Sequence, residues 1–432
     1  MAALPVNHPE RFLLADEVHA RPPVAIEAPA RASYVAVLID ADDRTREHAH
    51  LVQLCERFAA APPLAAATHH SVRLSAHLHL KWERHGEFSG YTFFTSGAAP
   101  APFTQPAVSL LPPGWIDRIP GSTIAACHID VVRADAVPDT AALLALFPGL
   151  HPVGAEVADG AALAYTDFRI QDDGYGRVLV VDRGLSPRQA GRLVQRLFEI
   201  EAYRMLALLA LPIARRQSPR ILAIERSLAE LTDGIARGEG DDEALLHELT
   251  RLAAEVESGL AASQFRFGAC RAYYDLVRTR IGELREARVS GFQSIDEFMS
   301  RRLTPAVATC TTVSQRLQDL SERVAQASAL LSTRVDIARE RQNQALLASM
   351  DRRARLQLRL QETVEGLSVA AITYYSAGVM GYIAKAAHAL GAPINPEVVV
   401  GVMIPFIAVL VIWAVRRARQ RIVAAEDGAS SV

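Results

Sequence analysis

Two long stretches without a charged residue lie near the C-terminal end of the sequence and limit most strongly what it can fold into. They run from Gly366 to Ala384 and from Val398 to Val415. As α-helices they would each be about 27–29 Å long, close to the roughly 30 Å hydrocarbon core of a bilayer. The sequence therefore predicts transmembrane helices at 366–390 and 398–418, joined by a short external loop at 391–397.

Basic and aromatic residues at the ends of these stretches predict the orientation of the hairpin. Lysine snorkels and indole anchors at a membrane interface, and arginine clusters stay on the cytoplasmic side. The residues expected at the interface are Arg352, Arg353, Arg355, Arg359, Lys385, Trp413, Arg416 and Arg417. Both termini, including the tail at 419–432, are then cytoplasmic. The alternative, a hairpin buried in a soluble bundle, does not account for arginines at both outer ends.

Overall composition excludes several classes of protein. The 432 residues allow two or three folded units, and a net charge of −2 gives no footprint for nucleic acid. The four cysteines lie far apart without a Cys-x-x-Cys, which argues against a zinc ribbon and fits a reducing compartment. No apolar run resembling a signal peptide is present in the first thirty residues, so we expect the N-terminal part in the cytoplasm.

Residues 1–213 are predicted to form a mixed α/β domain, which makes the whole chain an α+β protein. Strict alternation of apolar and polar residues from Val72 to Trp82 predicts one half-buried strand. Further strands are expected at Tyr34–Ile39, Tyr91–Thr95, Thr123–Val132, Ala161–Ile170 and Arg177–Val181. Helices are expected at Arg44–Ala60, at Ala141–Phe147 and from Ser186 to about Leu211.

After this domain the pattern becomes purely helical. Residues 214–300 are predicted to form a helical hairpin, and 301–365 a long stalk helix of which Pro305–Glu365 would span about 90 Å. Apolar residues alternating by 4 and 3 form a coiled-coil seam, namely Val313, Leu317, Leu320, Val324, Ala327 and Leu331. The stalk would run into the first span and join copies of the chain into a homo-oligomer. In the alternative, its first half packs on the neighbouring hairpin.

The first span carries small and weakly polar residues, whereas the second is nearly all aliphatic. Such residues mark the helix that faces protein in a membrane, so the first span is expected to be the inner one. Candidate residues for a pathway or its mouth are Ser368, Thr373, Ser376 and Asn395. The alternative is that Gly378 and Gly381 only allow the two helices of one hairpin to approach.

The order of these parts resembles the CorA-type magnesium transporters. Gly378-Val379-Met380-Gly381-Tyr382 stands where that family has a Gly-Met-Asn signature, and Asn395-Pro396-Glu397 is similar to its outer loop. The resemblance implies a pentameric membrane protein with a cytoplasmic domain, a stalk helix and two spans. Because the asparagine is missing here, it implies a divalent cation without identifying magnesium.

The chain also resembles a bacterial family of membrane-anchored proteins of unknown function. The segments that carry this resemblance are Asn7–Pro9, Asp16–Pro23, Lys81–His85, Thr166–Arg169, Glu201–Met205 and Thr363–Ser368. It implies a location in the bacterial inner membrane and a two-span C-terminus. It brings no known activity.

Few residues indicate chemistry. His77 and His79 would point to one face of the predicted strand and could share a metal ion, although a solvated polar face is the alternative. Asp16, Glu17, His19 and Arg21 could bind a metal or an anion, or form salt bridges. The sequence contains no phosphate-binding loop, nucleophile elbow or zinc-protease motif. We therefore expect no enzyme and no cofactor beyond a divalent cation.

Two hypotheses for function follow. The first is an oligomeric inner-membrane protein of CorA-like architecture that passes or senses a cation. The second is a membrane-tethered interaction or scaffold protein without transport or enzymatic activity.

Overall fold

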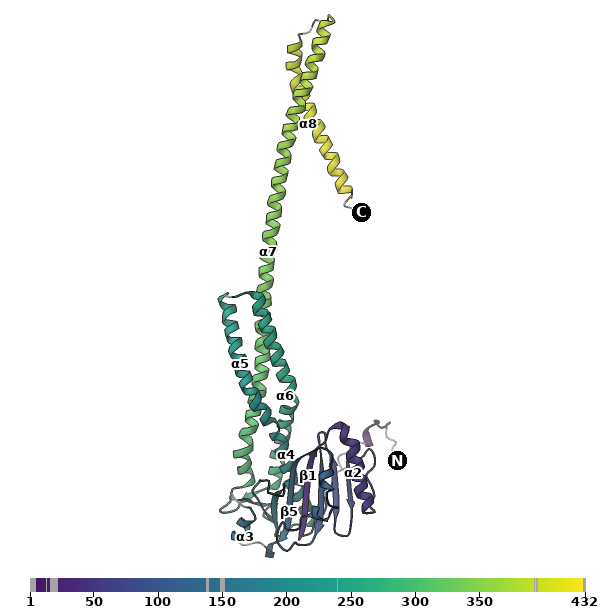
Figure 1. Cartoon of the computed structure of the whole chain (residues 1–432), viewed down its shortest axis with the longest axis vertical. Coiled ribbons are helices and arrows are strands. Elements are labelled where there is room, and N and C mark those ends of the chain that lie inside the picture. The colour runs from purple at the N-terminus through teal and green to yellow at the C-terminus, as the bar shows by residue number, and fades with distance from the viewer. Residues whose placement is uncertain are drawn as a thin grey trace. The chain divides into compact units, whose positions relative to one another are not determined.

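The computed structural model describes residues 5–12, 14–15, 22–136, 140–147, 152–238, 240–391, 393 and 395–429. It contains two compact units, Met1–Ala329 and Leu330–Val432. The Asp16–Arg21 segment lies outside the described residues. Figure 1 traces the elements of both units.

The first unit is built on a nine-stranded mixed sheet in the order β2-β3-β4-β1-β5-β8-β7-β6-β9. The strands are β1 (Ala30–Leu38), β2 (His69–Arg73), β3 (His79–Arg84), β4 (Phe88–Ser96), β5 (Ser122–Arg133), β6 (Val153–Val157), β7 (Ala162–Thr166), β8 (Gly176–Asp182) and β9 (Ala287–Arg288). All neighbouring pairs are antiparallel except β5 and β8, which are parallel. The predicted mixed domain is therefore confirmed at the level of its fold class.

One face of the sheet is covered by α2 (Arg44–Arg57), α3 (Thr140–Ala145) and the loop between β4 and β5. The short 3-10 helices are η1 (Ala41–Asp43), η2 (Ala107–Leu110), η3 (Ile116–Arg118) and η4 (Ala134–Ala136), of which η2 and η3 contribute to the core on this face. A large apolar core lies beneath α2 and the loop, with Trp82 and Trp115 among its buried members. A smaller core contains Phe103, Phe147 and Leu179.

The opposite face is covered by α4 (Pro187–Leu208), against which α6 (Asp242–Leu284) packs (Figure 1). Tyr34 of β1 stacks on Phe198 of α4 with ring centroids 5.0 Å apart, and Phe88 of β4 meets Tyr203 edge-on at 6.4 Å. Ser186 and Gln189 form a capping box at the start of α4, with Pro187 in the first turn. Helix α4 is thus buried from two sides.

The helical part of this unit is a three-helix bundle of α5 (Ala210–Arg237), α6 and the first part of α7 (Ile295–Ala389). Gly238 ends α5 in the left-handed conformation (φ 69°), and the Asp241 side chain caps α6. Several polar contacts join α7 to the other helices, among them Arg316 to Glu225 at 2.6 Å and Ser321 to Glu257 at 2.7 Å. The predicted αα-hairpin and the uninterrupted long helix are both present.

The predicted seam of α7 is buried within one chain. Its residues Val313, Leu317, Leu320, Val324, Ala327 and Leu331 are all buried. Leu317 lies against Gly259, where an added Cβ would be 3.4 Å from its methyl carbon. This matches the alternative that the first half of the long helix packs on the neighbouring hairpin. An oligomer formed through α7 would therefore need another surface of the helix.

Several local details differ from the predictions; for example, the helix expected to run to about Leu211 ends at Leu208, and α5 begins at Ala210, before the expected boundary at 214. The alternation from Val72 to Trp82 is not one strand, because the chain reverses between β2 and β3 and Val72 pairs with Leu80. The short strands β6 and β9 were not predicted. The long helix begins at Ile295, earlier than expected, because Glu286 accepts hydrogen bonds from the backbone N–H groups of Ile295 (3.1 Å) and Asp296 (2.8 Å).

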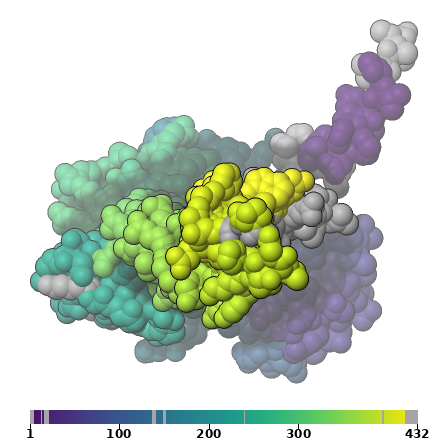
Figure 2. All heavy atoms as spheres, turned by 90° about the horizontal axis from the view of Figure 1, so that it is seen from above, coloured from purple at the N-terminus to yellow at the C-terminus, as the bar shows by residue number. Residues whose placement is uncertain are grey.

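The second unit contains residues 330–389 of α7 and helix α8 (Pro396–Ala429). Each of these helices contains a segment long and apolar enough to span a membrane, and each segment is only 6% buried. A core helix of a soluble protein would be mostly buried. Figure 2 shows the tip of this hairpin, with yellow atoms of α8 beside the yellow-green end of α7.

Replacing Leu317 by alanine tests whether the seam belongs to the intrachain core. We expect the free energy of unfolding of the bundle to fall by about 2–5 kcal/mol, because a buried leucine is truncated among neighbours that cannot fully close the cavity. Leu222→Ala, on the exposed side of α5, should change it by less than about 1 kcal/mol. Denaturation followed by circular dichroism measures both. Loss of subunits from an oligomer without loss of stability would contradict this assignment.

Candidate functional site

The histidines predicted to bind a metal lie at a hairpin and not along one strand. His77 is in the connection between β2 and β3, and His79 is the first residue of β3, with Nε2 2.9 Å from the Ser71 hydroxyl. Both still line a common cavity of about 330 Å³, together with Arg73 and Glu27. Burial and the nearby Arg73 lower the pKa of His79.

The geometric basis for the metal site is therefore corrected, because alternation along a single strand does not align the two imidazoles. Across the residues that the structure describes, no three histidine, cysteine or acidic side chains gather into a group able to hold a metal ion. Metal binding at His77 and His79 stays a prediction.

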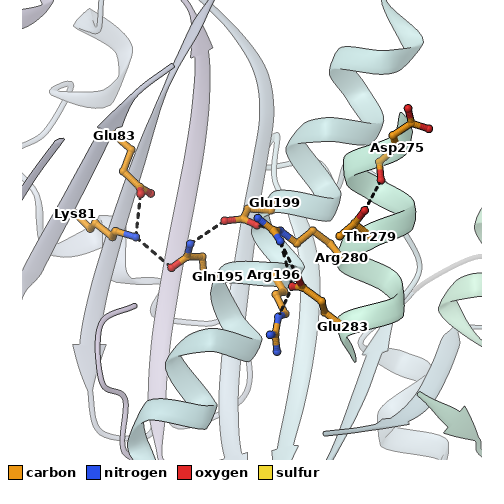
Figure 3. Close-up of polar contacts among 9 residues, drawn as sticks. All are labelled: Lys81, Glu83, Gln195, Arg196, Glu199, Asp275, Thr279, Arg280 and Glu283. Atoms are coloured by element: carbon orange, nitrogen blue, oxygen red, sulfur yellow. Dashed lines mark hydrogen bonds and ion pairs between the residues drawn. The ribbon is translucent and has the colours of Figure 1, made fainter. Parts of the chain in front are cut away.

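Charged side chains form a continuous chain of contacts from the sheet through α4 to α6 (Figure 3). Lys81 on β3 contacts the Glu83 carboxylate at 3.0 Å and donates to Gln195 Oε1 on α4 at 3.2 Å. Gln195 donates in turn to Glu199 at 2.8 Å. Lys81 is only 5% exposed, so the polar face that the sequence left open to solvent is covered by α4.

The chain of contacts continues onto α6 through two arginines. Arg280 pairs with Glu199 and, at 3.1 Å, with Glu283. Glu283 also accepts a hydrogen bond of 2.8 Å from Arg196 on α4 (Figure 3). Three cations and three carboxylates alternate along this path, which we call the charge relay: Lys81, Glu83, Glu199, Arg280, Glu283 and Arg196. Its charges balance, as partly buried ion pairs require.

A small cavity of about 30 Å³ adjoins the sheet end of the charge relay. Tyr34, Lys81, Glu83 and Thr92 line it, and it has room for about two water molecules. Burial, together with the neighbouring Tyr203, Glu83 and Glu199, raises the pKa of Tyr34 well above its usual value. Its hydroxyl therefore stays protonated.

Beside this cavity, the backbone at Val24 and Ile26 packs unusually close to the start of α4. Ile26 N–H donates to the Pro187 carbonyl at 3.0 Å, and a Cβ on Gly191 would lie 1.8 Å from the Val24 carbonyl oxygen. Only glycine fits at position 191. Val24 lines both the 30 Å³ and the 330 Å³ cavities.

Segments that carry the resemblance to the uncharacterised family meet around α4. Arg204 pairs with Glu201, donates to the Phe168 carbonyl at 3.2 Å and lies over the Phe168 ring at 5.4 Å. Lys81 and Glu83 approach the same helix in the charge relay. Segments far apart in the sequence thus support one helix.

A second polar cluster lies on the other face of the sheet, beneath the loop between β4 and β5. The Ser33 hydroxyl is 2.9 Å from His128 Nδ1, and the His128 ring stacks on Tyr175 at 3.9 Å. Asp130 Oδ2 accepts the Phe103 N–H at 2.8 Å, whereas its Oδ1 has no hydrogen-bond partner. Burial lowers the pKa of His128 to about 4 and raises that of Asp130 to about 6.

Sequence reasoning missed this cluster, although a signal was present. His128 and Asp130 are two residues apart in the part of β5 from Ile124 to Val132, which is otherwise apolar, so both point to one buried face. Ser33 is fully buried, which leaves a substrate no access to its hydroxyl. The cluster fastens the loop over the sheet.

In the second unit, three of the predicted pathway residues bond within their own helix. Ser368 donates to the Val364 carbonyl at 2.8 Å and Thr373 to the Val369 carbonyl at 2.7 Å. Asn395 Oδ1 accepts the Glu397 N–H at 3.1 Å and caps α8. Thr373 and Ser376 are half-buried, on the same face of α7 as Ala377 and Gly381. Their role in a pathway stays a prediction.

The small residues of α7 let α8 approach. A Cβ added at Gly381 would be 3.4 Å from a Val400 methyl carbon, whereas one added at Gly378 would meet nothing within 4 Å. The alternative prediction, that these glycines only allow the two helices of one hairpin to approach, therefore fits Gly381 but not Gly378. A groove of about 810 Å³ lies along the two helices, and Tyr374, Tyr382 and Lys385 are among the residues that line it.

The residues expected at a membrane interface are all exposed on these helices. The group comprises Arg352, Arg353, Arg355, Arg359, Lys385, Trp413, Arg416 and Arg417. Arg355 pairs with Asp351 at 2.7 Å, and Arg417 lies over the Trp413 ring at 5.0 Å. Their contact with lipid stays a prediction.

Fold and contacts together define an α+β protein with a charge relay in its sheet domain and two apolar C-terminal helices. The chain belongs to the family described as "Protein of unknown function (DUF3422)", whose model matches residues 6–422. This confirms the resemblance to an uncharacterised family, and the CorA-type resemblance is not confirmed.

The other comparisons add little. No curated protein matches the chain. Among solved structures, the chain is similar to the full-length CmaX protein, with 13% identity over 69% of this chain and 94% of that chain. The TM-score is 0.20, which supports no argument about fold or function.

Replacing Asp130 by asparagine tests its burial as a carboxyl group. The folded pKa of about 6 lies above the unfolded value of 3.8, so its favourable contribution is present below pH 3.8 and is lost as pH rises through 6. As pH rises from 4 to 7.5, we expect the free energy of unfolding of Asp130→Asn to increase by about 2–3 kcal/mol relative to that of the parent. Urea unfolding across this range measures the difference.

The exposed Asp42→Asn provides the matched control. The difference in free energy of unfolding between this variant and the parent should change by less than about 0.5 kcal/mol over the same pH range. The contribution of His128, which is lost as pH falls from 6.5 through about 4, is shared by all three proteins and cancels. A flat profile for Asp130→Asn would show that Asp130 is ionised when folded.

Proposed function

We propose that this chain is a membrane-tethered interaction protein. In this proposal α7 and α8 span the bacterial inner membrane at 366–390 and 398–418, both termini are cytoplasmic, and the spans join copies of the chain. The sheet domain then presents its binding surfaces to the cytoplasm. The arginines at both outer ends of the hairpin support this orientation.

A tyrosine face on α7 is the observation that carries the proposal. Tyr374, Tyr375 and Tyr382 are 77%, 72% and 77% exposed. Tyr374 and Tyr375 lie near the middle of the stretch from Gly366 to Ala384, far from either end, where tyrosine usually anchors a span. In the hydrocarbon core their hydroxyl groups would have no water to bond.

A second copy of the first span supplies what these side chains lack. Hydroxyl groups exposed to lipid are costly, and helices in membranes associate through small residues and interhelical hydrogen bonds. Gly378 lies on the same face and leaves space, since nothing stands within 4 Å of where its Cβ would be. The groove of about 810 Å³ on this face would receive the neighbouring helix.

A cation-passing or cation-sensing oligomer is the second candidate. It is favoured by the continuity of α7, whose 95 residues run from the bundle of the first unit into the apolar segment of the second. This matches the stalk helix of the CorA-type architecture. Ser368 and Thr373 donate their hydroxyl protons to carbonyls of their own helix, which leaves their oxygen lone pairs available to a cation.

Disulfide crosslinking in membranes tests the tyrosine face. Gly378→Cys, oxidised with copper phenanthroline, should give a crosslinked dimer, because the face would lie between copies. Val409→Cys, on an exposed part of α8, should stay monomeric. The native cysteines Cys55, Cys127, Cys270 and Cys310 are buried, so the introduced thiol is the reactive one. Equal crosslinking of both variants, or of neither, would refute self-association through this face.

Flux measurements separate the two candidates. The purified protein is reconstituted into liposomes that contain a magnesium-sensitive dye, and its subunits are counted in detergent. A tether should give no flux above protein-free liposomes. An assembly of five subunits that conducts magnesium would favour the second candidate over the first. In that case Ser376→Leu should reduce the flux, whereas Val409→Leu should not.

A further inference from the structure

A groove of about 490 Å³ lies between the start of α4 and the end of α6, on the first unit. Three arginines line it: Arg192 and Arg196 from α4, and Arg285 just after α6. Its volume exceeds that of a bare ion and falls within the range of sites for small organic molecules. None of the residues expected from the sequence to carry function lies in it.

The arginines differ in how far they are already paired. Arg285 pairs with Asp159, and Arg196 uses Nε to bond Glu283 at 2.8 Å. Within the described part of the chain, the terminal nitrogens of Arg196 have no partner, and Arg192 has no hydrogen bond or ion pair at all. The groove therefore has one uncompensated cation and a second guanidinium with unused donors.

The single carboxylate in the groove is already shared. Glu283 contacts both Arg196 and Arg280 at distances of 2.8 and 3.1 Å (Figure 3). Its charge is thus distributed over two cations, which leaves the free edge of Arg196 electropositive. The early turns of α4, where the helix dipole is positive, face the same space through Gln189 and Arg192.

We propose that this groove binds the phosphate group of a small anion. Two guanidinium groups one helical turn apart, at positions 192 and 196, offer unused N–H donors to the same groove, and guanidinium donors suit phosphate oxygens. Arg285 closes the opposite side. The inference goes beyond the proposed tether and holds whether or not the spans self-associate.

The backbone at Arg285 adds a separate argument. This residue has φ 49° and ψ 57°, the left-handed conformation that glycine usually provides at a helix C-terminus. An arginine here carries a conformational cost that its half-exposed pair with Asp159 does little to offset. A role in binding the anion would account for an arginine at this position.

Occupation of the groove would also reach the charge relay. A phosphate at the free terminal nitrogens of Arg196 shares the charge of that guanidinium with Glu283, which also pairs with Arg280, and Arg280 in turn holds Glu199. The contact between α4 and α6 therefore changes when the groove fills. This gives the sheet domain a ligand-dependent state.

Binding of phosphate to the full-length protein in a neutral detergent tests the proposal. Inorganic phosphate and glycerol 3-phosphate are titrated by calorimetry at constant ionic strength, with chloride as the reference anion. We expect Arg192→Gln to weaken binding by about tenfold or more, since an unpaired guanidinium is removed. Arg188→Gln, an exposed arginine on the same helix outside the groove, should leave the affinity unchanged.

Two further variants should change the affinity for phosphate in opposite directions. A general loss of structure would not do so. Arg285→Gly should weaken phosphate binding while leaving the melting temperature unchanged or higher, because glycine relieves the left-handed backbone. Glu283→Gln should tighten binding by about threefold or more, since it removes the competing charge. Equal affinities for Arg192→Gln and Arg188→Gln, or an equal response to chloride, would overturn the proposal.

The source of the phosphate is resolved by reconstitution. The full chain is placed in nanodiscs of phosphatidylcholine alone or with phosphatidylglycerol, and glycerol 3-phosphate is titrated again. Affinity that falls with phosphatidylglycerol in the parent, but not in Arg192→Gln, identifies an anionic lipid headgroup as the ligand. Affinity that is the same in both nanodiscs identifies a soluble phosphate. Either result requires binding at the groove.

Discussion

Burial of α4 between the sheet and α6 is the constraint on which the first unit depends. Its apolar side contacts β1 and β4 through Phe198 and Tyr203, and its polar side holds the charge relay. Removing one member of such a relay would leave a partly buried partner without a counter-charge, which is more costly than the pair is favourable. The helix is thus fixed in register as well as in place, and the cavities beside it are shaped by the same contacts.

The polar cluster on the other face works differently. It contains an acid and a base whose protonation states are set by burial and not by pairing, with pKa values of about 6 for Asp130 and about 4 for His128. Their linkage to pH has opposite signs. Between pH 4 and 6 the two contributions partly cancel, so the loop that they fasten keeps a similar stability across this range.

Periodicity predicted the helices well and the sheet less well. The stripes of α5, α6 and α7 were readable because a helix repeats its apolar face over many turns. Strand β9 is two residues long and β6 is five, so neither provides a pattern, and both exist because neighbouring strands pair with them. Alternation from Val72 to Trp82 continued through a reversal because Leu74 and Leu78 are both buried at the turn.

The charge relay and the groove could not have been predicted from the sequence. Lys81 and Glu83 alternate with apolar residues, which indicates a solvated face unless another element covers it. The spacing of Arg192 and Arg196 indicates the solvent-facing side of an amphipathic helix. What decides their role is the approach of α4 and α6, which are separated from β3 by many intervening elements. The seam of α7 posed the same problem, because a 4–3 repeat does not say whether its partner lies in the same chain.

The close approach at Gly191 has an architectural consequence. Val24 lines both the 30 Å³ and the 330 Å³ cavities, and its carbonyl oxygen occupies the place that a side chain at position 191 would need. Any substitution of Gly191 would therefore displace a residue that the two cavities share and change the shape of both.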